Sequence, residues 1–407
     1  MCKRKLVLAT TIGSFLEFYD FTVYNFFAIE IGKAVFSHQT AFVSTLLSFA
    51  IFAIGYIMRP LGGIIYGIKA DKYGRTKSLY HTLFMMALAT LIICLVPSSS
   101  CIGIFSPLLL LAARLLQGFA AGAESTVAPV LLLESGENRG ALLSCQFVAQ
   151  GLSGSLGAGL AAILHNSLTS EQLISWGWRV PFVIALLLLP IALLLRTYSL
   201  KHSKTEQPYV KTPTMLQNYK KLLLLDILTI FPTSVAIYTM AFYMPHFLIK
   251  LGHLSTKSFS LNTYSHIIMA LGALLGGLIA DKFKNLKHLV LPLLLAIDVL
   301  AIFSFLALNN GNDHLFSTTY LATMLAIGIL MTPSALLVLQ AFPRAVRGRA
   351  NGIGYSIGVA LFGGTTNVLL TSLQHYYNSI YTPLFYVSFA LATGIIIFAI
   401  FPNQGTK

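Results

Sequence analysis

Charged residues are scarce in this sequence. Only 10% of its 407 residues are Asp, Glu, Lys or Arg, whereas an ordinary soluble protein has about 25%. A soluble fold of this length exposes too much surface to cover it with so few charges. With 56% apolar residues and a mean hydropathy of +0.77, the composition excludes a soluble enzyme, a disordered chain and a nucleic-acid-binding domain.

Motifs for catalysis and metal binding are missing as well. The four cysteines have no framework spacing, so they are read as small apolar fillers. The chain has no zinc-ligand spacing, no phosphate-binding loop and no nucleophile motif. The sequence therefore predicts no enzyme, no cofactor and no metal, and it argues against an ATP-driven pump.

Long apolar runs fill most of the chain. A helix needs about 20 mostly apolar residues to cross a bilayer, and these runs are continuous rather than alternating, which favours helices over a barrel. We predict an all-α membrane protein with twelve transmembrane helices. The expected spans are 6–30, 42–66, 79–97, 104–133, 140–165, 178–196, 221–250, 260–280, 288–308, 315–341, 349–374 and 379–401.

The basic residues are sorted between the two sides of these spans. If the N-terminus lies inside, 21 of the 27 Lys and Arg residues fall in cytoplasmic segments, and Arg59 and Arg114 lie within spans. The four outside are Lys33, Arg179, Lys250 and Lys257. This asymmetry predicts that both termini are cytoplasmic, so the net charge of +14 does not indicate nucleic acid.

The chain is predicted to consist of two halves. A polar stretch divides it into a six-helix bundle at 1–200, a cytoplasmic linker at 201–219 and a second six-helix bundle at 220–407. The string ADKYGR after span 2 returns as ADKFKN after span 8, and Arg139-Gly returns as Arg347-Gly. Both pairs are separated by nearly the same offset, which indicates two six-helix pseudo-repeats.

Several strings resemble a known family. GIKADKYGRTK (67–77) and ARLLQGFAAGAE (113–124) are similar to the loop and span-4 motifs of the major facilitator superfamily. Strings similar to its metabolite:proton symporters, including the proline/betaine transporter, are GSFLEFYDFTVYNFFA, RPLGGIIYG, WGWRVPF and VRGRANGIGYSIGVALFGGT. The resemblance implies the major facilitator fold and a multi-pass protein of the bacterial inner membrane, which we expect to be a monomer.

Carboxylates within the spans are candidate proton-coupling groups. Glu17 and Asp20 lie three residues apart on one helical face, and their mutual repulsion in a low-dielectric environment favours proton uptake by one of them. The alternative is that one carboxylate simply pairs with Arg59 and holds spans 1 and 2 together. Glu124 is a further candidate proton site.

Two arginines within the spans are candidate substrate-binding groups. A guanidinium binds a carboxylate bidentately, so Arg114, and also Arg59, is suited to a substrate carboxylate. The alternative for Arg114 is a structural ion pair with Asp20 or Glu17. Gln117 and the tyrosines Tyr24, Tyr243 and Tyr355 are the other expected binding residues.

Aromatic residues and histidines carry a weaker signal. Aromatic faces suit a quaternary ammonium group, although aromatics at helical spacing are more often packing residues. His246 and His266 lie near span ends, and we expect them to be hydrated rather than functional.

Charges at the predicted cytoplasmic ends of the spans suit a conformational latch. In the family that the sequence resembles, the loop aspartate pairs with arginine and with helix ends, which biases two global states. The corresponding residues here are Asp71, Arg75, Arg139, Asp281 and Arg347.

The function predicted from the sequence is secondary active transport by alternating access. A proton gradient drives uptake of a small polar metabolite, either a zwitterion such as proline or betaine or a small organic acid. The expected partners are that small molecule, protons and the lipid bilayer, and no nucleic acid. Two alternatives stay open: export of a drug, siderophore or metabolite, and a membrane sensor that does not transport.

Overall fold

The computed structural model describes residues 2–73, 75–202 and 219–402. Every regular element in these ranges is a helix. The first-half helices are α1 (Cys2–Phe26), α2 (Ala28–Val35), α3 (Ala41–Ile57), α4 (Arg59–Tyr73), α5 (Arg75–Leu95), α6 (Ser99–Ile102), α7 (Phe105–Glu134), α8 (Arg139–Ser167), α9 (Ser170–Ser175), the 3₁₀ turn η1 (Gly177–Arg179) and α10 (Val180–His202).

The second half is built in the same way. Its elements are α11 (Lys220–Ile237), η3 (Tyr238–Tyr243), α12 (Met244–Lys250), α13 (Ser255–Ala280), α14 (Lys287–Asn309), α15 (Asp313–Ala341), α16 (Arg344–Gly358), η4 (Val359–Gly363), α17 (Gly364–Tyr377) and α18 (Thr382–Ile400). The predicted linker at 201–219 lies mostly outside the described residues, so the predicted domain boundaries stay a prediction.

The helices coincide with the twelve predicted spans. In the part of the chain that the structure describes, nine helices are long and apolar enough to cross a bilayer, and two shorter apolar helices cover His81–Leu95 and Gly177–Pro190. The remaining span is α1 with α2, whose apolar run is interrupted by Glu17 and Asp20. The predicted all-α fold is therefore confirmed.

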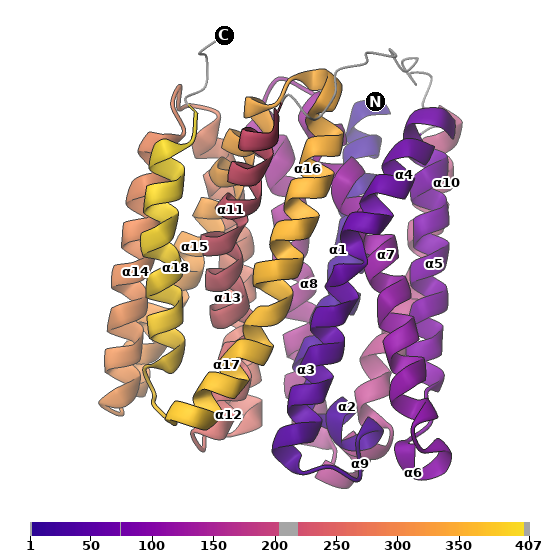
Figure 1. The fold of residues 1–407 in the computed structure, drawn as a ribbon, viewed down its shortest axis with the longest axis vertical. Helices are drawn as coiled ribbons and strands as arrows, with labels where there is room; N and C mark the ends of the chain where they lie inside the picture. Colours follow the sequence, from indigo (N-terminus) through magenta and orange to yellow (C-terminus); the bar gives the residue numbers. More distant parts are fainter. Residues whose placement is uncertain (1, 74, 203–218, 403–407) are drawn as a thin grey trace.

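Two upright helix bundles stand side by side (Figure 1). Each has its own apolar core: the rings of Tyr24, Phe52 and Trp178 belong to the first, and those of Phe247 and Phe305 belong to the second. Because both bundles bury apolar side chains inward and expose others outward, large residues such as leucine cover the outer surface of both, as expected next to lipid.

Four spans are not regular α-helices along their whole length. α1 and α2 meet at Phe27, and α3 and α4 meet at Met58. η3 and η4 are π-helical segments inside the seventh and eleventh spans. Such segments widen a helix locally and are frequent at functional sites, and periodicity in the sequence does not predict them.

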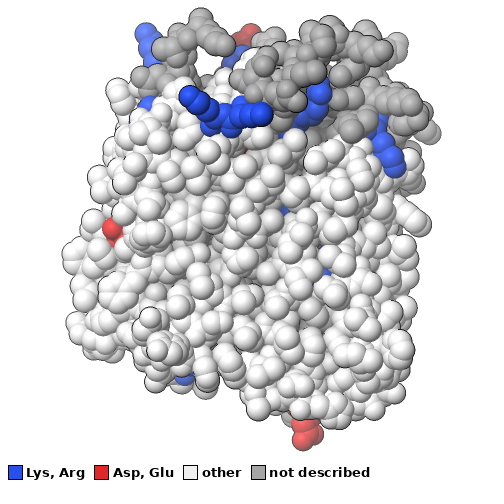
Figure 2. All heavy atoms as spheres, in the orientation of Figure 1, with Lys and Arg blue, Asp and Glu red and all other residues white. Residues whose placement is uncertain are grey.

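α1 begins, α10 ends, α11 begins and α18 ends at the same end of the molecule (Figure 1); we call it the termini end. Lys and Arg side chains gather at this end in the view of Figure 2, while the belt below is almost free of charge. A charge-poor belt with basic side chains on one side is the distribution expected of a bilayer-spanning protein.

The two halves touch at both ends of the molecule. At the termini end, Gly140 of α8 and Gly277 of α13 allow close backbone approach, since a Cβ atom on Gly277 would lie 2.6 Å from the Gly140 carbonyl oxygen. At the other end, Nε2 of His246 lies 2.8 Å from the Asn25 carbonyl oxygen, and the rings of Phe42 and His375 stack 3.8 Å apart. The halves thus contact each other at both ends of the molecule.

Candidate functional site

A cavity of about 110 Å³ lies between the two halves. Both halves contribute aromatic and polar side chains to its wall, and the two π-helical segments contribute Tyr238, Phe242 and Val359. Its lining residues are Phe18, Phe21, Thr22, Phe52, Tyr56, Phe147, Gln150, Asp226, Thr229, Ile230, Thr233, Ser234, Ile237, Tyr238, Phe242, Met269, Met331, Ser334, Ala335, Val338, Asn351, Tyr355, Val359 and Phe398.

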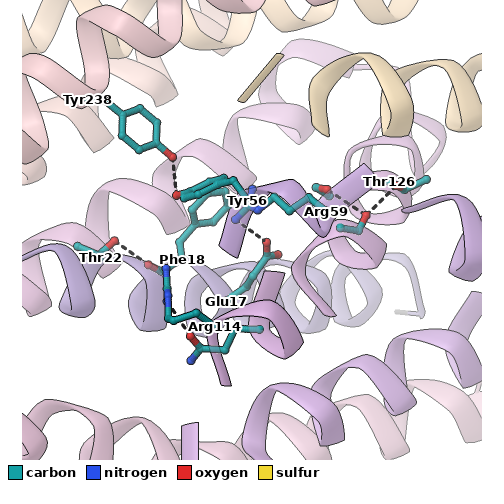
Figure 3. A network of polar contacts seen from close by, with 11 residues as sticks. Glu17, Phe18, Thr22, Tyr56, Arg59, Arg114, Thr126 and Tyr238 are labelled. Atoms are coloured by element: carbon teal, nitrogen blue, oxygen red, sulfur yellow. Dashed lines mark hydrogen bonds and ion pairs between the residues drawn. The ribbon is translucent and has the colours of Figure 1, made fainter. Parts of the chain in front are cut away.

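A buried ion pair lies beside the cavity. Nη2 of Arg59 is 3.5 Å from Oε1 of Glu17 (Figure 3), and the two side chains are 1% and 6% exposed. The guanidinium carbon of Arg59 also lies 4.5 Å from the ring centres of Phe21 and Tyr56. Such cation–π contacts are stronger in desolvated sites, so the pair and the rings together hold the arginine in place.

A second arginine is reached through a chain of hydrogen bonds. Nη1 of Arg114 donates to Oε1 of Gln117 at 2.6 Å, and Nε2 of Gln117 donates to the Thr90 hydroxyl at 3.1 Å. That hydroxyl donates to Oδ2 of Asp20 at 2.5 Å. Asp20 and Arg114 therefore belong to one buried network without direct contact between their charged groups.

Both arginines contact the same aromatic ring, that of Phe21. The guanidinium carbon of Arg114 lies 4.5 Å from the centre of the Phe21 ring, which Arg59 also contacts, and 4.4 Å from that of Tyr24. Tyr24 in turn donates to the Ser48 carbonyl oxygen at 3.2 Å. Phe21 lines the cavity, so one ring of the cavity wall contacts both cations.

Both guanidinium groups keep donors without an acceptor. Among the described residues, these are Nε of Arg59 and Nε and Nη2 of Arg114, while Nη2 of Arg59 faces Glu17 in the ion pair. Buried donors of this kind are rarely left unsatisfied. Their presence beside a cavity is what a site for an anionic ligand group requires.

The two halves meet directly at this site. The Tyr238 hydroxyl, at the start of η3, donates to the Tyr56 hydroxyl at 2.6 Å (Figure 3). Tyr56 also contacts Arg59, so this hydrogen bond connects the second half to the buried ion pair.

The other expected site residues do not all lie at the cavity. Tyr355 lines the cavity, whereas Tyr243 donates to the Leu370 carbonyl oxygen at 3.3 Å, inside the second half. Glu124 is buried on α7, about 15 Å along the helix axis from Arg114. Asp20 also lines a small cavity of about 20 Å³, which is large enough for one water molecule.

Of the expected latch residues, Asp281 joins the halves. Its carboxylate accepts hydrogen bonds from the backbone amides of Gly140 at 2.6 Å and Ala141 at 2.9 Å, at the start of α8. Arg139 is the first residue of this helix. Arg347 donates from Nε and Nη2 to the carbonyl oxygen of Phe342 in its own half. The side chains of Asp71 and Arg75 lie outside the described part of the structure.

Thr90 and Tyr56 were not expected from the sequence. They carry hydrogen bonds of this site, but nothing in the local sequence distinguishes them from packing residues. Tyr238 is one of the tyrosines that the sequence suggests as cavity-lining, and it lies in the wall. Asp226 on α11 is 1% exposed and lines the cavity. Its signal was present, since it is a carboxylate inside a predicted span.

The expectation for the two histidines is wrong. His246 is 7% exposed and His266 is fully buried. His246 bonds across the halves to Asn25, while Nδ1 of His266 lies 2.9 Å from the Asn262 carbonyl oxygen. Both lie in the interface between the halves, which the position of a residue along its span does not reveal.

Comparison with known proteins gives a consistent result. The family model of the Major Facilitator Superfamily matches residues 10–365. The chain is 32% identical to a citrate-proton symporter of Klebsiella pneumoniae, with 96% of this chain and 90% of that protein covered. It is 30% identical to the proline/betaine transporter of Escherichia coli K12, with 97% and 82% covered.

The fold has solved counterparts. The xylose transporter XylE from E. coli, in a partially occluded inward-open conformation, superposes with a TM-score of 0.80 over 100% of this chain and 99% of that one, at 17% identity. XylE bound to 6-bromo-6-deoxy-D-glucose gives the same TM-score over 98% and 96%.

Proposed function

The chain belongs to the Major Facilitator Superfamily, a family of transporters rather than enzymes, and we propose that it couples uptake of a small polar metabolite with a carboxylate group to entry of protons. The single observation that carries this proposal is the pair of buried arginines that keep donors without an acceptor beside the central cavity. A substrate carboxylate supplies the acceptors that these donors lack.

Charge balance links the substrate to the proton. The two cations Arg59 and Arg114 lie with the two carboxylates Glu17 and Asp20 in buried surroundings. This group of four is neutral when all four are ionised. An organic acid that enters adds net negative charge, which is costly at low dielectric unless a proton arrives with it. A zwitterion adds no net charge, and its carboxylate competes with Glu17 for Arg59 unless Glu17 is protonated.

The proton acceptors in this proposal are Glu17 and Asp20. Protonation of Glu17 weakens its attraction to Arg59, so the guanidinium is free to bind the substrate instead. Protonation of Asp20 acts on Arg114 through Thr90 and Gln117. Substrate and proton then bind cooperatively, which is the thermodynamic requirement for symport. Glu124, buried elsewhere on α7, is the alternative proton site.

The aromatic wall bears on the choice of substrate. The rings of Phe21, Phe52, Tyr56 and Tyr238 line the cavity, and aromatic faces attract ammonium groups. This favours a zwitterion such as proline or betaine, the substrate that the name of one relative gives. A small organic acid is the other candidate, in line with the name of another relative.

The cycle that we propose is alternating access across a bacterial inner membrane. The termini end, which carries most Lys and Arg residues, faces the cytoplasm by the positive-inside rule. Contacts such as Asp281 with the start of α8 hold this end closed. Loss of these contacts lets the halves open toward the cytoplasm.

The decisive experiment is transport in proteoliposomes. Purified protein is given amino acids, betaines, and di- and tricarboxylates in turn, and proton uptake is recorded with a pH-sensitive dye. We expect one class of substrate to drive proton entry, and an inward proton gradient to drive accumulation of that substrate. Efflux of a substrate loaded inside the vesicles, without uptake, indicates export. The absence of any substrate-dependent proton movement contradicts the proposal.

Arg114→Gln is expected to abolish uptake, and retained uptake of an organic acid removes Arg114 from the site.

A further inference from the structure

Asp226 is a buried carboxyl group that the proposed mechanism does not use. It is 1% exposed and lines the central cavity, and among the described residues neither of its side-chain oxygens has a hydrogen-bond partner. The neighbouring Thr229 hydroxyl donates at 2.7 Å to the backbone carbonyl of Asp226 and not to its carboxylate. Among the described residues, no protein donor compensates an ionised carboxylate in this position.

None of the described side chains around Asp226 offers a compensating charge. On α16, a Cβ atom at Gly354 would overlap the Asp226 carboxyl group, so the two helices pack closely there. The ionisable residues of the elements that pack against α11 are Tyr386 on α18; Asp313, His314 and Tyr320 on α15; Arg344, Arg347, Arg349 and Tyr355 on α16; and Tyr238 and Tyr243 on η3, while α11 itself has Lys220 and Lys221. No ion pair joins the described side chains among these to Asp226.

The position of Asp226 separates it from the arginines. Twelve residues of one continuous helical span separate it from Tyr238, about 18 Å along the axis. The charged ends of a small zwitterion are only a few bonds apart. One substrate molecule therefore does not reach Asp226 while its carboxylate is held by Arg59, so Asp226 is not the binding group for the substrate's ammonium.

We propose that Asp226 is a proton-binding group of the second half, which holds a proton while the halves are closed and releases it to water when the termini end opens. In the closed state the carboxyl group is neutral. When the cavity opens, water reaches the carboxyl group, its O–H bond breaks, the proton passes to water and a hydrated carboxylate remains. This inference rests on the proposed proton-coupled transport and adds a second site to it, on the exit side of Arg59.

Two measurements test this site, and the first is independent of transport. We expect the infrared spectrum of the full-length protein at neutral pH to contain the carbonyl band of a protonated carboxyl group, and Asp226→Asn to remove it. Asp298→Asn is the matched control, because Asp298 of the same half accepts a hydrogen bond from Ser388 at 2.5 Å. A wild-type minus Asp226→Asn difference spectrum without this band overturns the proposal.

The second measurement separates coupling from substrate binding. In proteoliposomes we expect Asp226→Asn to lower proton-driven accumulation of the wild-type substrate by roughly tenfold or more. Counterflow of the same substrate, which needs no net proton movement, is expected to stay within about twofold of wild type. Unchanged accumulation overturns the proposal, and so does lost counterflow in a variant whose melting temperature is unchanged. If the wild-type protein itself moves no protons, the proposed function fails, whatever the infrared result.

Discussion

The Tyr238 hydroxyl donates a 2.6 Å hydrogen bond to the Tyr56 hydroxyl, and this bond joins the two halves of the molecule at the wall of the central cavity. Tyr56 also lies against Arg59, whose guanidinium carbon is 4.5 Å from the centre of its ring. The ion pair of Arg59 and Glu17 therefore lies next to the Tyr238–Tyr56 hydrogen bond, which must break when the halves separate at this point.

Removing this hydroxyl tests the contact. We expect Tyr238→Phe to lower the apparent affinity for substrate by about 2- to 13-fold, which corresponds to a net hydrogen-bond contribution of about 0.5–1.5 kcal/mol. The measurement is concentration-dependent uptake in proteoliposomes. Tyr243→Phe is the matched control, since that hydroxyl bonds to Leu370 within the second half and its loss is expected to leave affinity close to wild type.

The ion pair of Arg59 and Glu17 gives a second prediction. Arg59→Gln leaves Glu17 without its cation, and we expect destabilisation of about 3–5 kcal/mol because a buried charge loses its partner. The double variant Arg59→Gln/Glu17→Gln removes both charges, and we expect it to recover most of the lost melting temperature but no proton-coupled uptake. A double variant as unstable as the single one shows that the pair does not account for the loss.

The presence of these charges inside the spans was predictable from the sequence, and so was one partner, because the alternative that a carboxylate pairs with Arg59 is confirmed by Glu17. The other partners were not predictable. Glu17, Asp20, Arg59 and Arg114 were identified because a charge inside an apolar run is rare. Which of them meet depends on how each helix is rotated and on which small or hydroxylated residues fill the space between. The link from Asp20 to Gln117 runs through Thr90, and a threonine in an apolar span carries no signal of that role.

The fold was more predictable than the site for a related reason. The length of an apolar run determines whether it crosses the bilayer, and this property is local. Tyr238, His246 and Asp226 owe their roles to contacts between spans far apart in the chain and to the π-helical segment at η3. These features arise only when the two halves pack together.

Close packing of α8 on α13 gives a third prediction. A Cβ atom on Gly277 would lie 2.6 Å from the Gly140 carbonyl oxygen, so Gly277→Ala must push the two helices apart. We expect a loss of about 1–3 kcal/mol in stability, seen as a lower melting temperature in detergent. Gly159→Ala on α8 is the control, because its Cβ atom meets Thr263 at an ordinary 3.7 Å. Equal melting temperatures for the two variants contradict the prediction.

The contact of Asp281 with the start of α8 gives a fourth prediction. In the wild type, the two Asp281 carboxylate oxygens accept hydrogen bonds from the backbone amides of Gly140 and Ala141. Asp281→Asn keeps one acceptor oxygen, so one of these bonds becomes neutral and the other is lost, because an amide NH2 group is a donor only. We expect the equilibrium to shift by about 5- to 150-fold toward states open at the termini end. The measurement uses Ser334→Cys in the cavity wall, in a background with the four native cysteines replaced by serine. Its labelling rate by a membrane-impermeant thiol reagent applied from the termini end should rise.

Asp313→Asn is the control for this experiment. Asp313 lies in the first turn of α15, at the opposite end of the molecule from Asp281, so its loss is expected to leave the labelling rate from the termini end unchanged. If Asp281→Asn and Asp313→Asn label alike, the carboxylate of Asp281 does not hold this end closed.

The opposite end has its own contact between the halves, and it predicts the reverse effect. Nε2 of His246 lies 2.8 Å from the Asn25 carbonyl oxygen, and the imidazole ring packs against Phe49 and Phe259. His246→Phe keeps an aromatic ring in this space but removes the hydrogen bond. We therefore expect faster labelling of Ser334→Cys from the end opposite the termini, and slower labelling from the termini end, because opening at one end requires closure at the other. Faster labelling from both ends would instead indicate that His246→Phe loosens the whole interface, which a lower melting temperature would confirm.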